Sequence, residues 1–160
     1  MMKRVVRFRH AEVADLRCRS LLYEGIIDPC RKRWSIFSVA APLILVVDDD
    51  ESVREALCGF LRSTGFAVNA FASGEEFLTS NQLRSANCLV LDVRMPGISG
   101  IELQRQLVAD HCEIPVIFIT AHGDEGIRAQ ALSGGAGAIL IKPFSEDALL
   151  NAIESALITQ

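Results

Sequence analysis

Short apolar runs alternate along the chain with segments that have the spacing of helices. Four runs are continuously apolar, as is typical of strands that helices cover on both faces of a sheet; they span residues 43–47, 88–91, 116–119 and 138–141. A fifth strand is expected over residues 66–71. Because strands and helices alternate from residue 43 to residue 158, the pattern predicts an α/β domain built on a five-stranded parallel sheet.

The segments between the strands carry helix signals. The first has the i, i+3, i+4, i+7, i+8 spacing of an amphipathic helix, followed by a glycine suited to a left-handed stop; the residues are Val53, Ala56, Leu57, Phe60, Leu61 and Gly65. Two more helices are expected to start at capping boxes of the form S-x-x-E, at Ser73 with Glu76 and at Ser99 with Glu102. A fourth helix is expected over about residues 125–132, and the last from about Ser145.

Composition places the chain among ordinary globular proteins. Half of its 160 residues are hydrophobic and 22% are charged, which excludes disorder of the whole chain. The five cysteines contain no C-x-x-C pair, as expected of a reduced cytosolic protein. No apolar run has the length of a membrane span, and the basic start lacks the apolar stretch of a signal peptide. We therefore expect a cytoplasmic protein that does not insert into membranes.

Charge divides the chain into two parts. Residues 1–40 hold nine Lys/Arg and four Asp/Glu, a net +5, whereas residues 41–160 hold seven and sixteen, a net −9. We interpret residues 1–40 as a basic N-terminal extension, either a disordered tail or the product of a misassigned start codon, and residues 41–160 as the folded domain. Contact between the nine basic side chains and nucleic-acid phosphates is the alternative for this extension.

Acidic, hydroxyl and basic side chains follow the apolar runs directly. Asp48-Asp49-Asp50, Asp92, Thr120 and Lys142 each come immediately after an apolar run. Open parallel α/β sheets bind ligands at the carboxyl ends of their strands, so these side chains are expected at one edge. Carboxylates that meet there repel each other and favour a hard cation such as Mg2+. With a lysine and a hydroxyl added, the set has the parts needed to hold a phosphoryl group, and Asp92 is the best candidate nucleophile.

Four motifs resemble the signatures of the receiver domain of two-component response regulators. They are Val46-Val47-Asp48-Asp49, Leu91-Asp92-Val93-Arg94-Met95-Pro96-Gly97 with Ser99-Gly100, Ile119-Thr120-Ala121, and Lys142-Pro143-Phe144. They occur in the order and spacing of the family over residues 43–158, and residues 92–100 and 120–124 are most similar to receivers of the FixJ type. The resemblance implies a flavodoxin-like, doubly wound sheet of order 2-1-3-4-5 with helices on both faces.

The resemblance implies roles for the acidic residues. Asp92 would become the aspartyl phosphate. Asp49 and Asp92 would ligate Mg2+, Asp48 would act through water, and the backbone carbonyl of Arg94 would be a further ligand. The flanking residues Arg94 and His122 are expected to influence how long the phosphate lasts, with an exposed loop histidine as the alternative for His122.

The same resemblance implies the phosphate contacts and a switch. Thr120, Ala121 and Lys142 would contact the phosphoryl group, and a cis peptide bond is expected between Lys142 and Pro143. In many family members an aromatic residue three places before the lysine swings inward when the threonine moves. Here that position is Ile139, so relay of the signal would depend on aliphatic repacking.

The resemblance implies a phosphoacceptor module. It would take its phosphoryl group from a histidine kinase or a phosphotransfer protein and catalyse only its own phosphorylation and dephosphorylation. It would offer a changed surface to an output partner that the sequence does not identify, or drain phosphate from a shared kinase. FixJ-type receivers reach DNA through a following helix-turn-helix domain; since this sequence ends at Gln160, directly after the last predicted helix, no direct DNA binding is expected.

Two other classes of protein fit part of the pattern. Asp48 and Asp50 have the D-x-D form used by haloacid-dehalogenase-like phosphatases, but that interpretation leaves Asp92 and Lys142 without a role. It also needs a later acidic motif, and Asp124 has no acidic partner four residues on. The other class is a pseudo-receiver or plain interaction module, against which the full acidic set argues.

Overall fold

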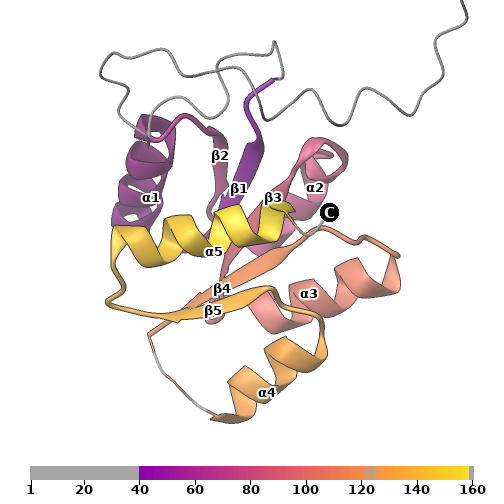
Figure 1. Ribbon diagram of the computed structural model, residues 1–160. Helices are drawn as coiled ribbons and strands as arrows, with labels where there is room; N and C mark the ends of the chain where they lie inside the picture. Colours follow the sequence, from indigo (N-terminus) through magenta and orange to yellow (C-terminus); the bar gives the residue numbers. More distant parts are fainter. Residues whose placement is uncertain (1–39, 122, 124, 159–160) are drawn as a thin grey trace, which may run out of the picture.

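A five-stranded parallel sheet organises the chain. The computed structural model describes residues 40–121, 123 and 125–158, and its strands have the expected order β2-β1-β3-β4-β5 (Figure 1). In chain order the elements are β1 (Leu43–Val47), α1 (Glu51–Ser63), β2 (Ala67–Phe71), α2 (Gly74–Thr79), the 3-10 turn η1 (Leu83–Ser85), β3 (Cys88–Asp92), α3 (Gly100–Ala109), β4 (Val116–Thr120), α4 (Glu125–Ser133), β5 (Ala138–Ile141) and α5 (Glu146–Ile158). The predicted strands and helices are therefore confirmed, whereas the predictions for residues 1–39 lie outside the described residues.

Helices cover both faces of the sheet. Successive strand residues point to opposite faces. In β1, Ile44 and Val46 pack in the cluster that includes residues of α1 and α5, while Leu45 and Val47 pack in the cluster that includes residues of α2, α3 and α4. All four side chains are fully buried. This two-sided burial explains why the strands are continuously apolar rather than alternating.

Strand register brings the carboxyl ends of the strands to one edge. The last residue of β1 pairs with Leu91 of β3, Asp92 pairs with Ile119 of β4, and Thr120 pairs with the last residue of β5. Strand order also reverses between β1 and β3, because β2 lies beyond β1 and β4 lies beyond β3. Ligands of doubly wound sheets bind at this reversal, so the fold points to the residues that follow β1 and β3.

The two predicted capping boxes differ in one hydrogen bond. At the start of α3, Ser99 accepts from the backbone N–H of Glu102 and the Glu102 carboxylate accepts from the backbone N–H of Ser99, which closes the box. At the start of α2, Ser73 accepts from the N–H of Glu76, but the Glu76 carboxylate accepts from the N–H of Ala72 instead. Both helices begin where predicted, and the second box is closed one residue earlier in the chain.

Two cysteines, Cys58 and Cys88, lie in the interior. Cys58 and Cys88 are buried in the cluster between the sheet and α1 and α5. Burial raises the pKa of the Cys88 thiol to about 12. At neutral pH this thiol is protonated and packs as a small hydrophobic side chain.

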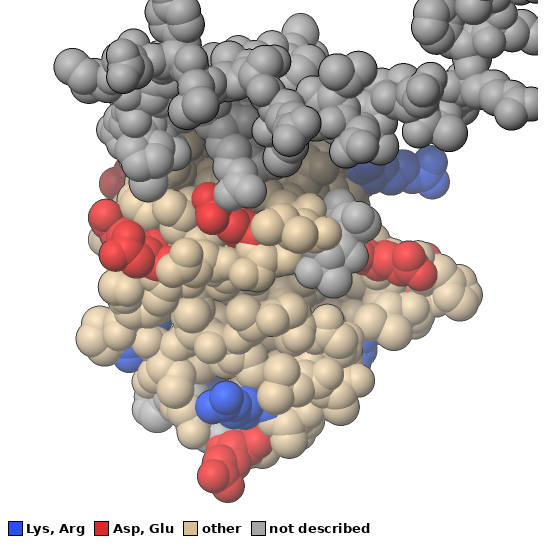
Figure 2. Space-filling view, viewed as in Figure 1, with Lys and Arg blue, Asp and Glu red and all other residues tan. Residues whose placement is uncertain are grey.

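The surface and the helix lengths bear on possible partners. In the view of Figure 2, uncharged side chains cover most of the described surface, and acidic and basic side chains are scattered among them. The described residues in this view form no continuous basic patch. Each helix of the described part of the chain is too short or too polar to cross a membrane.

Candidate functional site

One lysine joins two aspartates at the carboxyl edge of the sheet. The Lys142 ammonium, after β5, lies 2.8 Å from Asp48 Oδ2, after β1, and 2.8 Å from Asp92 Oδ1, at the end of β3. Asp48 is 0% exposed and Asp92 is 5% exposed, whereas the side chain of Lys142 is 25% exposed. These three residues, which we call the edge cluster, are separated by up to 94 positions in the chain. The predicted convergence of β1, β3 and β5 is therefore present.

Backbone donors fix the second oxygen of each aspartate. The N–H of Asp50 donates to Asp48 Oδ1 at 2.9 Å, and the N–H of Arg94 donates to Asp92 Oδ2 at 2.6 Å. Each carboxylate thus accepts one bond from the shared ammonium and one from its own loop. Two fixed bonds hold each carboxylate in place, and both carboxylates face the Lys142 ammonium.

Burial and charge act in opposite directions on the edge cluster. Burial raises the pKa of Asp92 above its usual value, although the hydrogen bond and charge of Lys142 oppose the rise. Burial lowers the pKa of Lys142, but the hydrogen bonds to Asp48 and Asp92 together with their negative charges outweigh it and leave the lysine pKa raised. With both aspartates ionised, two carboxylates share one ammonium, and the cluster carries one excess negative charge in a largely buried place.

The loop after β3 passes very close to α3. A Cβ atom on Gly100, the first residue of α3, would lie 2.2 Å from the backbone oxygen of Asp92. Any larger residue would push α3 away from the strand. The N–H of Gly100 donates to the oxygen of Val93 at 3.1 Å, which closes the loop that holds Asp92. The glycine of the predicted motif is therefore required by packing.

Thr120 and the Lys142-Pro143 bond occupy the predicted places. Thr120 ends β4, is 2% exposed, and its backbone oxygen accepts from the N–H of Lys142 at 2.8 Å. The Lys142-Pro143 peptide bond is cis, as expected. Ala121 follows Thr120 and is exposed. His122 lies outside the described residues.

Asp49 does not join the edge cluster. It is exposed, and its carboxylate forms no hydrogen bond or ion pair with the residues that the structure describes. Among those residues, no three His, Cys, Asp or Glu side chains already converge on one point. The edge cluster therefore contains two of the candidate carboxylates, because Asp48 points inward to Lys142 while Asp49, the next residue, faces solvent.

The donor atoms at this edge suit magnesium by their chemistry. Asp48, Asp49 and Asp92 offer only oxygen donors, which are the ligands that a hard cation takes. The excess negative charge of the edge cluster favours a cation beside it. The set is free of cysteine and histidine among the described residues, so it does not resemble a zinc site.

Ile139 borders a cavity beside α4. It lies on β5 opposite Phe118 and packs, partly buried, in the cluster that includes residues of α3 and α4. A cavity of about 450 Å³ lies there, and Thr120, Ile127 and Ile139 are among the residues that line it. The aliphatic side chain at this position therefore has free space between it and α4.

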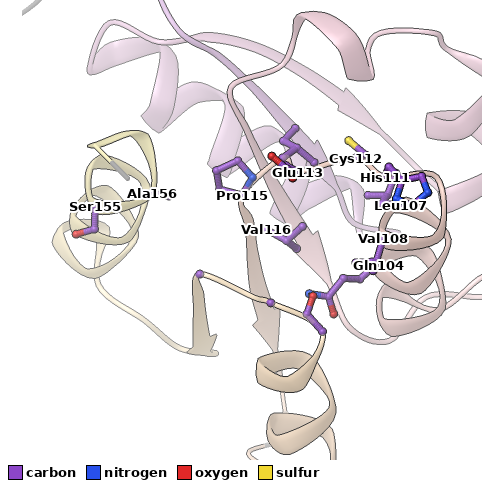
Figure 3. A pocket seen from close by; sticks show the side chains of 14 residues that line it. Gln104, Leu107, Val108, His111, Cys112, Glu113, Pro115, Val116, Ser155 and Ala156 are labelled. Carbon is purple, nitrogen blue, oxygen red and sulfur yellow. The ribbon is translucent and has the colours of Figure 1, made fainter. Parts of the chain in front are cut away.

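A larger cavity lies at the opposite edge of the sheet. It has about 1010 Å³ and is lined by the end of α3, the start of β4 and the end of α5 (Figure 3). Gln104, Glu113 and Ala156 are among its lining residues, and none of the predicted site residues is. Cavity size alone therefore does not locate the chemistry of this protein.

Arg54 is a residue of this edge that the sequence analysis missed. Its Nη1 atom donates to the backbone oxygens of Asp48 at 2.8 Å and Asp49 at 2.9 Å. The only sequence signal is a long donor side chain one turn into the helix that follows the acidic run. That signal is weak, because an arginine on α1 has many other places to point.

The geometry is unfavourable for the D-x-D phosphatase alternative. Asp48, the nucleophile in that interpretation, is fully buried against Lys142. Asp50, the acid/base, instead caps α1 by accepting from the N–H groups of Ser52 and Val53. Its carboxylate is occupied in holding the helix.

Comparison with known proteins decides the family. The model of the response regulator receiver domain matches residues 44–154. The chain belongs to this family. Phosphorylation and Mg2+ are general features of response regulator receivers in two-component systems.

Relatives of this receiver include named regulators. It is 43% identical over 129 residues to response regulator protein TodT of Pseudomonas putida, and the aligned region covers 81% of this chain and 57% of TodT. It is 45% identical over 114 residues to nodulation protein W of Bradyrhizobium diazoefficiens, and the aligned region covers 71% of this chain and 50% of that protein. The receiver chain therefore spans about half the length of these curated relatives.

Solved structures show the same fold. The crystal structure of FixJ-N is 37% identical in sequence, has a TM-score of 0.69, and the match covers 76% of this chain and 98% of FixJ-N. The structure of response regulator StyR is 52% identical with a TM-score of 0.70, and the match covers 75% of this chain and 61% of StyR. The predicted resemblance to FixJ-type receivers is confirmed.

Proposed function

We propose that this receiver accepts a phosphoryl group on Asp92 from a histidine kinase or a phosphotransfer protein, with Mg2+ as cofactor. The observation that carries the proposal is the edge cluster, in which a lysine 2.8 Å from two buried aspartates gathers the ends of β1, β3 and β5. Asp92 is the acceptor because it ends the strand at the reversal of strand order and contacts Lys142.

Phosphoryl transfer needs little proton chemistry from this site. An ionised Asp92 attacks phosphorus without a general base, an O–P bond forms, and the P–N bond of the phosphohistidine donor breaks. The donor imidazole keeps the electron pair and takes a proton from solvent. Lys142 already contacts Asp92, so it is placed to pair with the phosphoryl oxygens, and we assign the hydroxyl of Thr120 and the backbone of Ala121 to the same role.

The metal-holding residues are assigned to the same edge. Asp49, Asp92 and the backbone carbonyl of Arg94 would hold Mg2+, with Asp48 acting through water. When bound, the ion neutralises charge on the phosphoryl oxygens. Asp49 is the exposed member of the set and makes no competing bond among the described residues, so it is free to serve as a ligand.

The proposed output of the receiver takes one of two forms. Phosphorylation at Asp92 would change the surface near Thr120 and Ile139, and that change would be offered to an output partner, or the chain would drain phosphate from a shared kinase. Relatives include proteins named as transcriptional regulators, such as FixJ of Bradyrhizobium diazoefficiens. A cytoplasmic location is part of the proposal, because a histidine kinase delivers its phosphoryl group there.

Acetyl phosphate tests the acceptor assignment. Incubation of the whole chain with acetyl phosphate and Mg2+ should add the mass of one phosphoryl group in intact-mass measurement, and Asp92→Asn should abolish that gain. Asp110→Asn is the matched control, since Asp110 is exposed at the end of α3 and does not contact the edge cluster among the described residues. Phosphate uptake by Asp92→Asn at the rate of the wild type would refute the assignment.

A further inference from the structure

Arg54 makes an unusual choice of partners. It lies on α1 three positions after a run of four acidic residues, positions 48–51, yet both of its hydrogen bonds go to backbone oxygens, those of Asp48 and Asp49. The ion pairs among the described residues are those of Lys142, so Arg54 neutralises no carboxylate by direct contact. A guanidinium that binds these two carbonyls holds the main chain and does not pair with the Asp49 carboxylate.

The two carbonyls flank a single residue. The oxygen of Asp48 belongs to the peptide unit before Asp49, and the oxygen of Asp49 belongs to the unit after it. Holding both units fixes the backbone angles of Asp49, and therefore the direction in which its side chain leaves the chain. No other contact does this, because within the described part of the chain the Asp49 carboxylate is exposed and unbonded.

Neighbouring bonds make the turn rigid except at Asp49. Asp48 is tied by its N–H to the oxygen of Phe71 at 3.3 Å and by its carboxylate to Lys142, and Asp50 is tied to α1 as its cap. Arg54 connects these two fixed points across Asp49. Loss of its guanidinium would leave one free residue between two anchored ones.

We propose that Arg54 is a positioning residue, which clamps the Asp48-Asp49 turn so that Asp49 is already aimed for a divalent cation. The proposal rests on the proposed function, because it assumes that Mg2+ binds beside Asp49 and Asp92. Partners that orient a metal ligand without touching the metal typically contribute about tenfold or more to affinity. Arg54→Ala should therefore weaken Mg2+ binding about tenfold without changing the acceptor.

Calorimetric titration of the whole chain with Mg2+ alone, at fixed ionic strength, measures the effect directly. Arg62→Ala is the matched control, because Arg62 is on the same helix and also donates to a backbone oxygen, that of Val68 at 2.9 Å, away from the edge cluster. Arg54→Ala should raise the Kd about tenfold, and Arg62→Ala should leave it unchanged. Equal affinities of Arg54→Ala and wild type, or equal losses in both variants, would overturn the proposal.

A second variant separates geometry from charge and guards against misfolding. Arg54→Lys keeps the positive charge but replaces the rigid planar guanidinium with a rotatable ammonium on a shorter side chain. Its Kd should lie between those of wild type and Arg54→Ala, and a Kd equal to that of wild type would overturn the clamp. If Arg54→Ala does not fold, Arg54→Lys alone decides.

Measurement of phosphate uptake separates a failure of the Arg54 proposal from a failure of the proposed receiver function. In acetyl phosphate, Arg54→Ala should need about tenfold more Mg2+ for half-maximal uptake and reach the wild-type rate at saturation. If wild type itself takes up no phosphate or binds no Mg2+, the proposed function fails. If wild type does both and Arg54→Ala matches it, only the role of Arg54 fails.

Discussion

The edge cluster holds one more negative charge than positive charge in a place that excludes most water. Asp48 and Asp92 are nearly unexposed, and one ammonium, that of Lys142, serves both. The raised pKa of Asp92 means that its ionised form is less stable in the folded protein than in the unfolded chain, even with Lys142 beside it. In the absence of metal, ionised Asp92 therefore lowers the stability of the folded protein. A cation bound beside it would offset this loss.

Neutralising Asp92 should stabilise the metal-free protein. Because the folded pKa of Asp92 lies above the ordinary value of 3.8, the wild type loses stability as pH rises from about that value through the folded pKa. Asp92→Asn lacks this loss, so its free energy of unfolding at pH 7 should exceed that of wild type. Urea denaturation in EDTA measures the difference, which should shrink as pH falls toward 4. A difference that stays constant or grows on acidification would contradict the assigned cause.

Sequence could place the acidic and basic residues at one edge, but not how they pair. Asp48, Asp92 and Lys142 were predictable because each follows an apolar strand, and parallel strands end at a common edge. That Lys142 contacts both aspartates, and that Asp49 remains exposed, depends on side-chain directions that no spacing specifies. Arg54 was missed for the same reason, because its bonds go to backbone oxygens, which have no signature in the sequence.

Element ends were predictable where the chemistry of a single residue decides them. Ser99 begins α3 with both bonds of its box, and Gly65 follows α1 at φ +100°, a conformation that suits glycine. The second box closes differently because Glu76 finds the N–H of Ala72 within 2.7 Å. A motif of four residues thus predicts where a helix begins but does not choose between two neighbouring N–H groups.

Removing the Ser99 cap should destabilise α3 and the loop that holds Asp92. Ser99→Ala deletes the acceptor for the N–H of Glu102 and a hydroxyl bond to its carboxylate at 2.6 Å. The free energy of unfolding should fall by about 1 kcal/mol, as measured by urea denaturation. Ser63→Ala, which removes only the exposed bond to Phe60 at the end of α1, should change it by less than about 0.5 kcal/mol. Equal losses in the two variants would mean that the cap does not stabilise α3.

At the scale of the whole molecule, convergence is a property of topology rather than of any segment. Residues up to 94 positions apart meet because β1 lies beside β3 and β5 ends at the same edge. Periodicity predicted five parallel strands, but it did not predict their order; that came from the resemblance to a known family. Residues 41–160, most of which the structure describes, have a net charge of −9. This charge attracts cations to the whole surface of the domain, in addition to any specific binding at the edge cluster.

Specific binding of Mg2+ should be separable from this general attraction by its effect on unfolding. A cation that binds only the folded state stabilises it by about 2.7 kcal/mol at one hundred times its Kd, which corresponds to a rise of roughly 8 °C in Tm. The rise should saturate in wild type at constant ionic strength and reverse on addition of EDTA. Asp92→Asn loses a carboxylate ligand and should show a much smaller rise over the same range. If wild type and Asp92→Asn gain equally, the effect is screening of the acidic domain, and the edge cluster is not a magnesium site.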